Sequence, residues 1–119
     1  MMTDAEVKPN AHGMYPDANA EHLILPRLAR GWMGCPTAEI RLLETRNGWL
    51  SAAHYDLSGH GGGGYGLSPK WHGGFLPDRK SALAHAVAYI ADHSRGTHRD
   101  AVRITLWLAS LTPAQLSLF

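Results

Sequence analysis

Histidine is the residue type in this chain with the greatest capacity for chemistry. The 119 residues include eight histidines, and a neutral imidazole nitrogen is a common zinc ligand. His54, His60 and His72 are close enough in sequence to converge on a zinc ion with one open position. Their spacing matches no zinc motif, and no carboxylate is placed to orient them. We therefore expect no metal site and no cofactor, and keep a histidine-lined metal enzyme as a third hypothesis.

Nucleophilic and acid–base catalysis have little support in the sequence. Cys35 lies between Gly34 and Pro36 without the local signature of a cysteine enzyme, and no Gly-x-Ser-x-Gly motif is present. Glu39 and Glu44 are expected on opposite faces of one strand. We predict no catalytic residue and expect that the chain is not an enzyme.

A glycine-rich segment spans residues 59–66. Glycine allows backbone amides to approach a phosphate, but a P-loop also needs a Lys and a hydroxyl that lead into a helix. A dinucleotide-binding turn likewise opens a helix, whereas this segment leads toward another strand. We expect a flexible connection between strands, and its role stays open.

Basic side chains could line one side of the molecule. The candidates for contact with nucleic acid are Lys70, Arg79, Lys80, Arg99 and Arg103, with Trp49, Tyr55 or Tyr65 as stacking platforms. The formal net charge is only +1, and no dense basic run is present. At most we expect weak, auxiliary contact with DNA. A small nucleic-acid-binding module that uses the hairpin and the Gly-rich segment is the alternative function.

The last residues, Gln115-Leu116-Ser117-Leu118-Phe119, carry the most specific signal. They follow Thr112-Pro113, where we expect a helix to end, and three of the five are large apolar side chains. Exposed apolar groups of this kind usually mark an interface. The order Gln-Leu-Ser-Leu-Phe resembles the pentapeptide with which many bacterial replication and repair proteins bind the DNA polymerase sliding clamp. By average residue usage, such a match arises by chance in roughly one chain of this size in 10⁴.

The resemblance implies a role for each residue of the pentapeptide. Gln115 would anchor one end through hydrogen bonds, Leu116 would make a shallow contact and Ser117 would act as a spacer. Leu118 and Phe119 would fill neighbouring hydrophobic pockets. The implied function is that of a replication or repair accessory factor or modulator, and a homodimer would gain avidity on a symmetric clamp. The competing interpretation is that the tail packs back on its own domain.

The pattern of apolar residues predicts the elements that would support such a tail. Residues 38–45 alternate with the period of a half-buried strand. Asn47-Gly48 then predicts a type I′ hairpin turn into a second strand that ends near Leu57. A third strand could run from Tyr65 to Trp71. Two helices should follow, the first capped by Asp78 and the second opened by a Thr97-x-x-Asp100 capping box.

The first helix should lay a single apolar stripe on the sheet, formed by Leu83, Ala86, Val87 and Ile90. The second should use a face made of Val102, Leu106 and Ala109, and its remaining apolar residues make it apolar nearly all round. Such a helix should be buried or meet a partner. Gly96 is expected to cap the end of the first helix.

We therefore predict an α+β fold in which two C-terminal helices cover a small antiparallel sheet of two or three strands. In outline it is similar to double-stranded-RNA-binding-like domains. Residues 1–36 should be a partly disordered N-terminal arm, 37–111 the domain and 112–119 the tail.

The sequence shows neither an apolar leader nor a membrane-spanning run, and its lone cysteine fits a reducing compartment. We expect a soluble, cytoplasmic protein without membrane contact.

Overall fold

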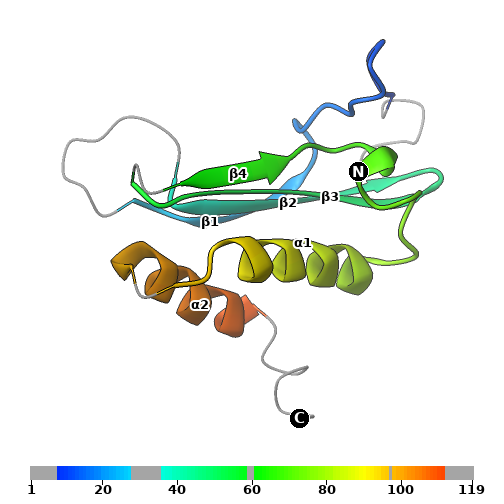
Figure 1. Ribbon diagram of the computed structural model, residues 1–119. Coiled ribbons are helices and arrows are strands. Elements are labelled where there is room, and N and C mark those ends of the chain that lie inside the picture. Colours follow the sequence, from blue (N-terminus) through cyan, green and yellow to red (C-terminus); the bar gives the residue numbers. More distant parts are fainter. Residues whose placement is uncertain (1–7, 28–35, 59–60, 97, 112–119) are drawn as a thin grey trace.

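The computed structural model describes residues 8–27, 36–58, 61–96 and 98–111. Within these ranges the chain forms a four-stranded antiparallel sheet, and two helices cover one of its faces (Figure 1). This is the α+β fold class that the sequence predicted, with one strand more than expected. The strands lie in the order β1-β2-β3-β4, so each pairs with its neighbour in the sequence. No helix in these ranges is long and apolar enough to cross a membrane.

The elements have well-separated bounds. In chain order they are β1 (Glu21–Leu25), β2 (Ala38–Thr45), β3 (Gly48–Asp56), β4 (Gly62–Tyr65), the 3₁₀ helix η2 (Pro69–Trp71), α1 (Arg79–His93) and α2 (Arg99–Leu111).

The central hairpin of β2 and β3 forms where the sequence predicted it. Ala38 pairs with Tyr55 at one end and Thr45 with Gly48 at the other, which leaves a loop of Arg46 and Asn47. The predicted turn type was wrong. Gly48 has a φ of 135°, but Asn47 is not among the residues with positive φ, as a type I′ turn would require.

The two outer strands differ from the prediction. β1 lies within the segment that the sequence assigned to the arm, and it pairs with β2 from Glu21↔Leu42 to Leu25↔Ala38. The third strand of the prediction was placed too late in the chain. β4 uses Gly62–Tyr65, inside the segment expected to be a flexible connection, whereas Pro69–Trp71 forms η2.

Both helices pack on the same face of the sheet. Asp78 caps α1 as predicted, because its carboxylate accepts a hydrogen bond of 2.7 Å from the Ser81 amide. The helix ends earlier than expected. Ser94 is its C-cap and donates its amide hydrogen to the carbonyl of Ile90, while Gly96 lies two residues beyond with a φ of 141°.

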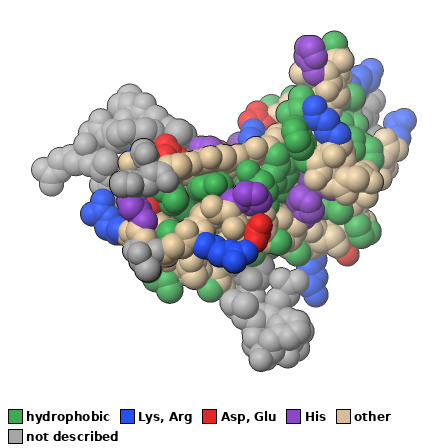
Figure 2. All heavy atoms as spheres, viewed as in Figure 1, with side chains coloured by type: hydrophobic (Ala, Val, Ile, Leu, Met, Phe, Trp, Pro, Cys, Tyr) green, Lys and Arg blue, Asp and Glu red, His purple; other side chains and the backbone are tan. Residues whose placement is uncertain are grey.

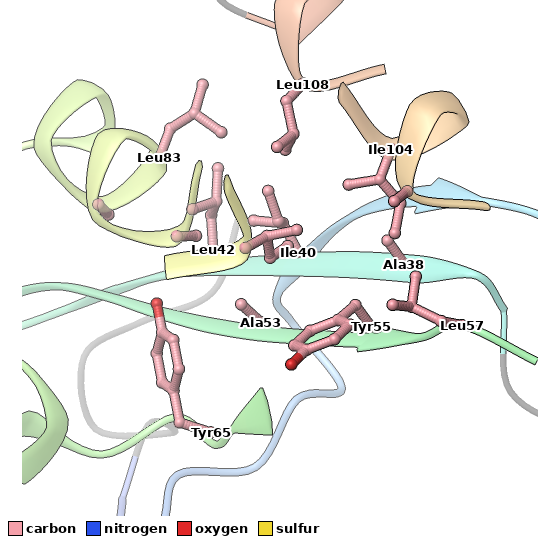
Figure 3. Close-up of a cluster of buried hydrophobic side chains, with 14 residues drawn as sticks. Ala38, Ile40, Leu42, Ala53, Tyr55, Leu57, Tyr65, Leu83, Ile104 and Leu108 are labelled. Carbon is pink, nitrogen blue, oxygen red and sulfur yellow. The ribbon is translucent and has the colours of Figure 1, made fainter. Parts of the chain in front are cut away.

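The main core fills the space between the sheet and the helices (Figure 3). Figure 3 shows Ile40, Leu42 and Ala53 of the sheet pointing toward Leu83 of α1 and toward Ile104 and Leu108 of α2. The predicted stripe of α1 is confirmed, since Leu83, Ala86 and Ile90 are buried and Val87 is partly buried.

The inward face of α2 was predicted wrongly. Its buried apolar residues are Ala101, Ile104 and Leu108, whereas Val102 and Leu106 are exposed. Because this helix is apolar nearly all round, its sequence did not show which side would face the core.

A second cluster covers part of the opposite face of the sheet. Leu43, Leu50, Ala52 and Leu67 form its buried centre, with Tyr15 and Phe75 packed against them. The Tyr15 amide donates to the Leu67 carbonyl at 2.8 Å. Part of the predicted arm therefore contributes to the packing of the sheet.

Candidate functional site

A chain of polar side chains lies between the sheet and α1. It links Ser51 of β3, Tyr65 of β4, His72 just after η2, and His85 of α1. The Ser51 Oγ lies 3.0 Å from His72 Nε2 and 2.8 Å from the Tyr65 hydroxyl. That hydroxyl lies 3.0 Å from His85 Nδ1. We refer to these four residues as the Ser51 network.

The backbone assigns the tautomer of His72. The Ser51 amide donates to His72 Nε2 at 3.3 Å, so Nε2 must carry a lone pair and the ring proton sits on Nδ1. The Ser51 hydroxyl then donates to Nε2, and the Tyr65 hydroxyl donates to Ser51. A chain in which Tyr65 donates to Ser51 and His85 Nδ1 donates to Tyr65 is consistent with this tautomer. His72 Nδ1 is buried without a hydrogen-bond partner.

Aromatic contacts surround this network. The Tyr65 ring meets His72, His85 and Tyr89 edge-on, with centroids 5.8, 5.6 and 5.0 Å apart. Tyr89 also stacks on His93 at 4.2 Å. Figure 2 shows histidine side chains at the surface of this side of the molecule, between the sheet and the helices.

Burial keeps the Ser51 network neutral near pH 7. Desolvation lowers the pKa of His72, and the neighbouring His85 lowers it further. Desolvation also lowers the pKa of His85. Burial raises the pKa of the Tyr65 hydroxyl to about 12, because the charged form of each group would lose its hydration.

Ser51 and His72 are the residue types of a nucleophile and its general base, but the Ser51 hydroxyl is not accessible to a substrate. Ser51 is fully buried, at 0% exposure, so a substrate cannot reach its hydroxyl without displacing core residues. The network instead holds the turn after η2 and helix α1 on the sheet. Sequence reasoning missed it, although one signal was present. Ser51 is a polar residue on the inward face of β3, and a buried hydroxyl needs a partner.

The histidines do not assemble as the zinc hypothesis required. His54 pairs in register with Glu39 and Gly64 and alternates with Ala53 and Tyr55, so it faces away from the helices. His60 lies outside the described residues. In the part of the chain that the structure describes, no group of three or more His, Cys, Asp or Glu residues could hold a metal ion.

A second polar cluster joins the end of β3 to the start of α2. Ser58 has a φ of 55°, which is uncommon for a residue with a side chain. Its hydroxyl donates to Asp100 Oδ2 at 2.6 Å and accepts a hydrogen bond of 2.6 Å from Arg27. Asp100 is 3% exposed. Its negative charge in the first turn of α2 interacts favourably with the helix dipole.

The predicted capping box lies partly outside the described residues, because Thr97 is among those left out. Its other member, Asp100, contacts Ser58. The Asp100 amide donates to His98 Nδ1 at 3.1 Å, so a histidine ring accepts the hydrogen bond of an amide that the helix leaves unpaired.

Steric crowding against β3 explains why β4 contains glycines. A Cβ on Gly62 would lie 2.8 Å from the Tyr55 carbonyl oxygen, and a Cβ on Gly64 would lie 2.6 Å from that of Ala53. Both contacts are with backbone, which cannot move aside without disturbing the ladder. β4 therefore approaches β3 more closely than residues with side chains would allow.

The five cations predicted to contact nucleic acid are used in different ways. Arg79 forms two hydrogen bonds of 2.8 Å with Glu21, and Arg103 donates to the Pro26 carbonyl at 3.0 Å. Lys70, Lys80 and Arg99 are exposed. The stacking role expected for Tyr55 and Tyr65 was wrong, because these side chains are 8% and 9% exposed.

The pentapeptide Gln115–Phe119 lies outside the described residues. Comparison of the chain with known proteins gave no match to a family model, to a curated protein or to a solved structure.

Proposed function

We propose that this chain is a non-enzymatic, cytoplasmic protein that binds the bacterial DNA polymerase sliding clamp through Gln115–Phe119. It would act as an accessory factor or modulator of replication or repair. The observation that carries the proposal is the Gln-Leu-Ser-Leu-Phe order, which begins four residues after Leu111, the last residue of α2.

The fold of the described residues is compatible with this proposal. Among the described residues, the buried side chains of the main core run from Ala38 to Leu108. The fully buried Ser51 also favours a binding role over catalysis.

The energetics are compatible with moderate affinity. Burial of Leu116, Leu118 and Phe119 would contribute roughly 4–9 kcal/mol, and ordering five backbone units costs about 5–10 kcal/mol. Hydrogen bonds from Gln115 and the main chain must supply the surplus. We expect a dissociation constant for the tail no tighter than about 1 μM, near −8 kcal/mol.

Binding of the full chain to a purified bacterial clamp tests the proposal. The double variant Leu118→Ala/Phe119→Ala should lose at least about tenfold in affinity, because the two deepest contacts are removed. Ser117→Ala is the matched control and should bind like the wild type, since this position is a spacer. Equal binding by the wild type and the double variant, or no binding by either, would contradict the proposal.

A second candidate function is a weak nucleic-acid-binding module. The observation that favours it is the pair formed by Trp71, which is 47% exposed, and Lys70, whose Nζ lies 4.8 Å from the Trp71 ring centroid. An exposed indole next to a cation suits stacking on single-stranded bases. Affinity for an oligonucleotide should fall steeply with salt and on Trp71→Ala. Undetectable or salt-independent binding would remove this candidate.

A further inference from the structure

Beyond Arg99, the outer face of α2 is an uncharged surface. Val102 is 47% exposed and Leu106 is 67% exposed, one turn apart on the same side of the helix. The other exposed positions between them and the helix end are also uncharged, namely Thr105, Ala109 and Ser110. We call these five residues the outer α2 face.

The only charged side chain between Val102 and Leu111 is that of Arg103, and it forms hydrogen bonds with other parts of the fold. Arg103 donates from one nitrogen to Thr37 Oγ1 at 3.3 Å and from another to the Pro26 carbonyl at 3.0 Å. By contrast, the exposed positions of α1 include Arg79, Lys80 and Asp92. α1 thus has the charged outer side of an ordinary surface helix, whereas the exposed charge of α2 is confined to Arg99 in its first turn.

An exposed apolar patch with polar neighbours is typical of an interaction site. We propose that the outer α2 face is a second contact with the sliding clamp, made to an uncharged, apolar surface beside the pocket that takes the pentapeptide. This inference rests on the proposed function. It adds a contact by which the folded domain, in addition to the tail, recognises the same partner.

Continuity of the chain favours the clamp as the occupant of the outer α2 face. Three residues, Thr112, Pro113 and Ala114, separate Leu111 from Gln115, and four extended residue steps span at most about 14 Å. Leu106 lies about 8 Å along the helix axis from Leu111. A protein surface that holds the pentapeptide is therefore within reach of the outer α2 face.

The size of the face argues against a second copy of this chain as the occupant. A stable interface buries about 800 Å² on each partner, whereas this face offers two large apolar side chains and three small residues. Such a patch is too small to hold two free molecules together. It can still contribute when a tethered peptide raises the local concentration of the partner surface to about the millimolar range.

The test compares the full chain with a synthetic peptide of residues 112–119, both titrated against purified clamp. The wild-type chain should bind about tenfold more tightly than the peptide, because only the chain carries the outer α2 face. Leu106→Glu should reduce the affinity of the chain to that of the peptide. Ala91→Glu, which introduces the same charge at an exposed position of α1, should leave the affinity unchanged.

Three results would overturn the inference. If the peptide binds and Leu106→Glu binds like the wild-type chain, the second contact is absent while the proposed function stands. If neither the chain nor the peptide binds, the proposed function fails and the inference fails with it. If the wild type is a dimer by light scattering and Leu106→Glu is a monomer, a second copy covers the face. Val102→Lys provides an independent variant, and circular dichroism checks that each variant is folded.

Discussion

Ser51 Oγ lies 3.0 Å from His72 Nε2, so a fully buried hydroxyl depends on an imidazole at the edge of the core. The Ser51 amide donates to the same nitrogen. The hydrogen bond from the Ser51 amide requires the lone pair of Nε2, and protonation of the ring removes it. The charge state of His72 is thereby linked to the packing of η2 and α1 on the sheet.

The first prediction concerns acid stability. Burial lowers the pKa of His72 below its ordinary value of 6.5. The neutral ring therefore contributes stability above pH 6.5, and this contribution is lost as the pH falls through the folded-state pKa. His72→Gln, which retains an acceptor, should show a smaller drop in Tm between pH 7.5 and pH 5 than the wild type.

His22 provides a control of opposite sign. Its hydrogen bond with Glu39 raises its pKa, so it contributes stability below pH 6.5 that is lost as the pH rises through the folded-state pKa. His22→Gln should therefore lose stability mainly at pH 5. An identical pH profile for wild type and His72→Gln would contradict the assigned role of His72.

The second prediction concerns the hydroxyl of Ser51. Ser51→Ala should lower the free energy of unfolding by about 1–3 kcal/mol, because Tyr65 and His72 would each lose a buried partner. Tyr65→Phe should act through the same contacts, so the two effects should not add in a double-mutant cycle. Ser110→Ala, at an exposed position of α2, should change the stability by no more than about 0.5 kcal/mol. Urea denaturation gives the free energy of unfolding of the two single variants, of their double variant and of Ser110→Ala. Strict additivity of the Ser51→Ala and Tyr65→Phe effects would argue against a connected network.

The third prediction concerns the cluster at the start of α2. Asp100→Asn should lower the free energy of unfolding by about 1–3 kcal/mol, since it weakens the contact with Ser58 and removes a buried charge that the Ser58 hydroxyl links to Arg27. Asp92→Asn is the control. Asp92 is exposed and pairs with Arg95 at the end of α1, so a change within about 1 kcal/mol is expected. Equal losses in thermal or urea unfolding would count against a special role for Asp100.

The fourth prediction concerns the glycines of β4. Gly64→Ala should destabilise the fold by about 2 kcal/mol or more, because its Cβ would lie 2.6 Å from the Ala53 carbonyl oxygen. Gly63→Ala should cost less. Its Cβ would meet the Tyr89 hydroxyl at 3.1 Å, and that side chain can shift. A Gly64→Ala protein with wild-type Tm would show that β4 does not need this close approach.

The features that could be predicted from the sequence are local ones. The hairpin of β2 and β3, the apolar stripe of α1 and the Asp78 cap each depend on residues within a few positions of one another. A period of two or of 3.6 residues is visible without knowledge of the fold. The Gly-rich segment was predicted to be a connection, but part of it forms β4. Its glycines are needed because the backbone of β3 lies so close, and no local sequence pattern shows that contact.

The sequence by itself determined the α+β class, the strand faces of the hairpin and the pentapeptide that motivates the proposed function. Only the tertiary structure decided that Ser51 meets His72, since that contact depends on the path of the chain through β4 and η2. It also decided which side of α2 is buried. The helix is apolar nearly all round, and the sheet and α1 together select Ala101, Ile104 and Leu108 for the core. Val102 and Leu106 are left at the surface because only one side of a helix can face one layer.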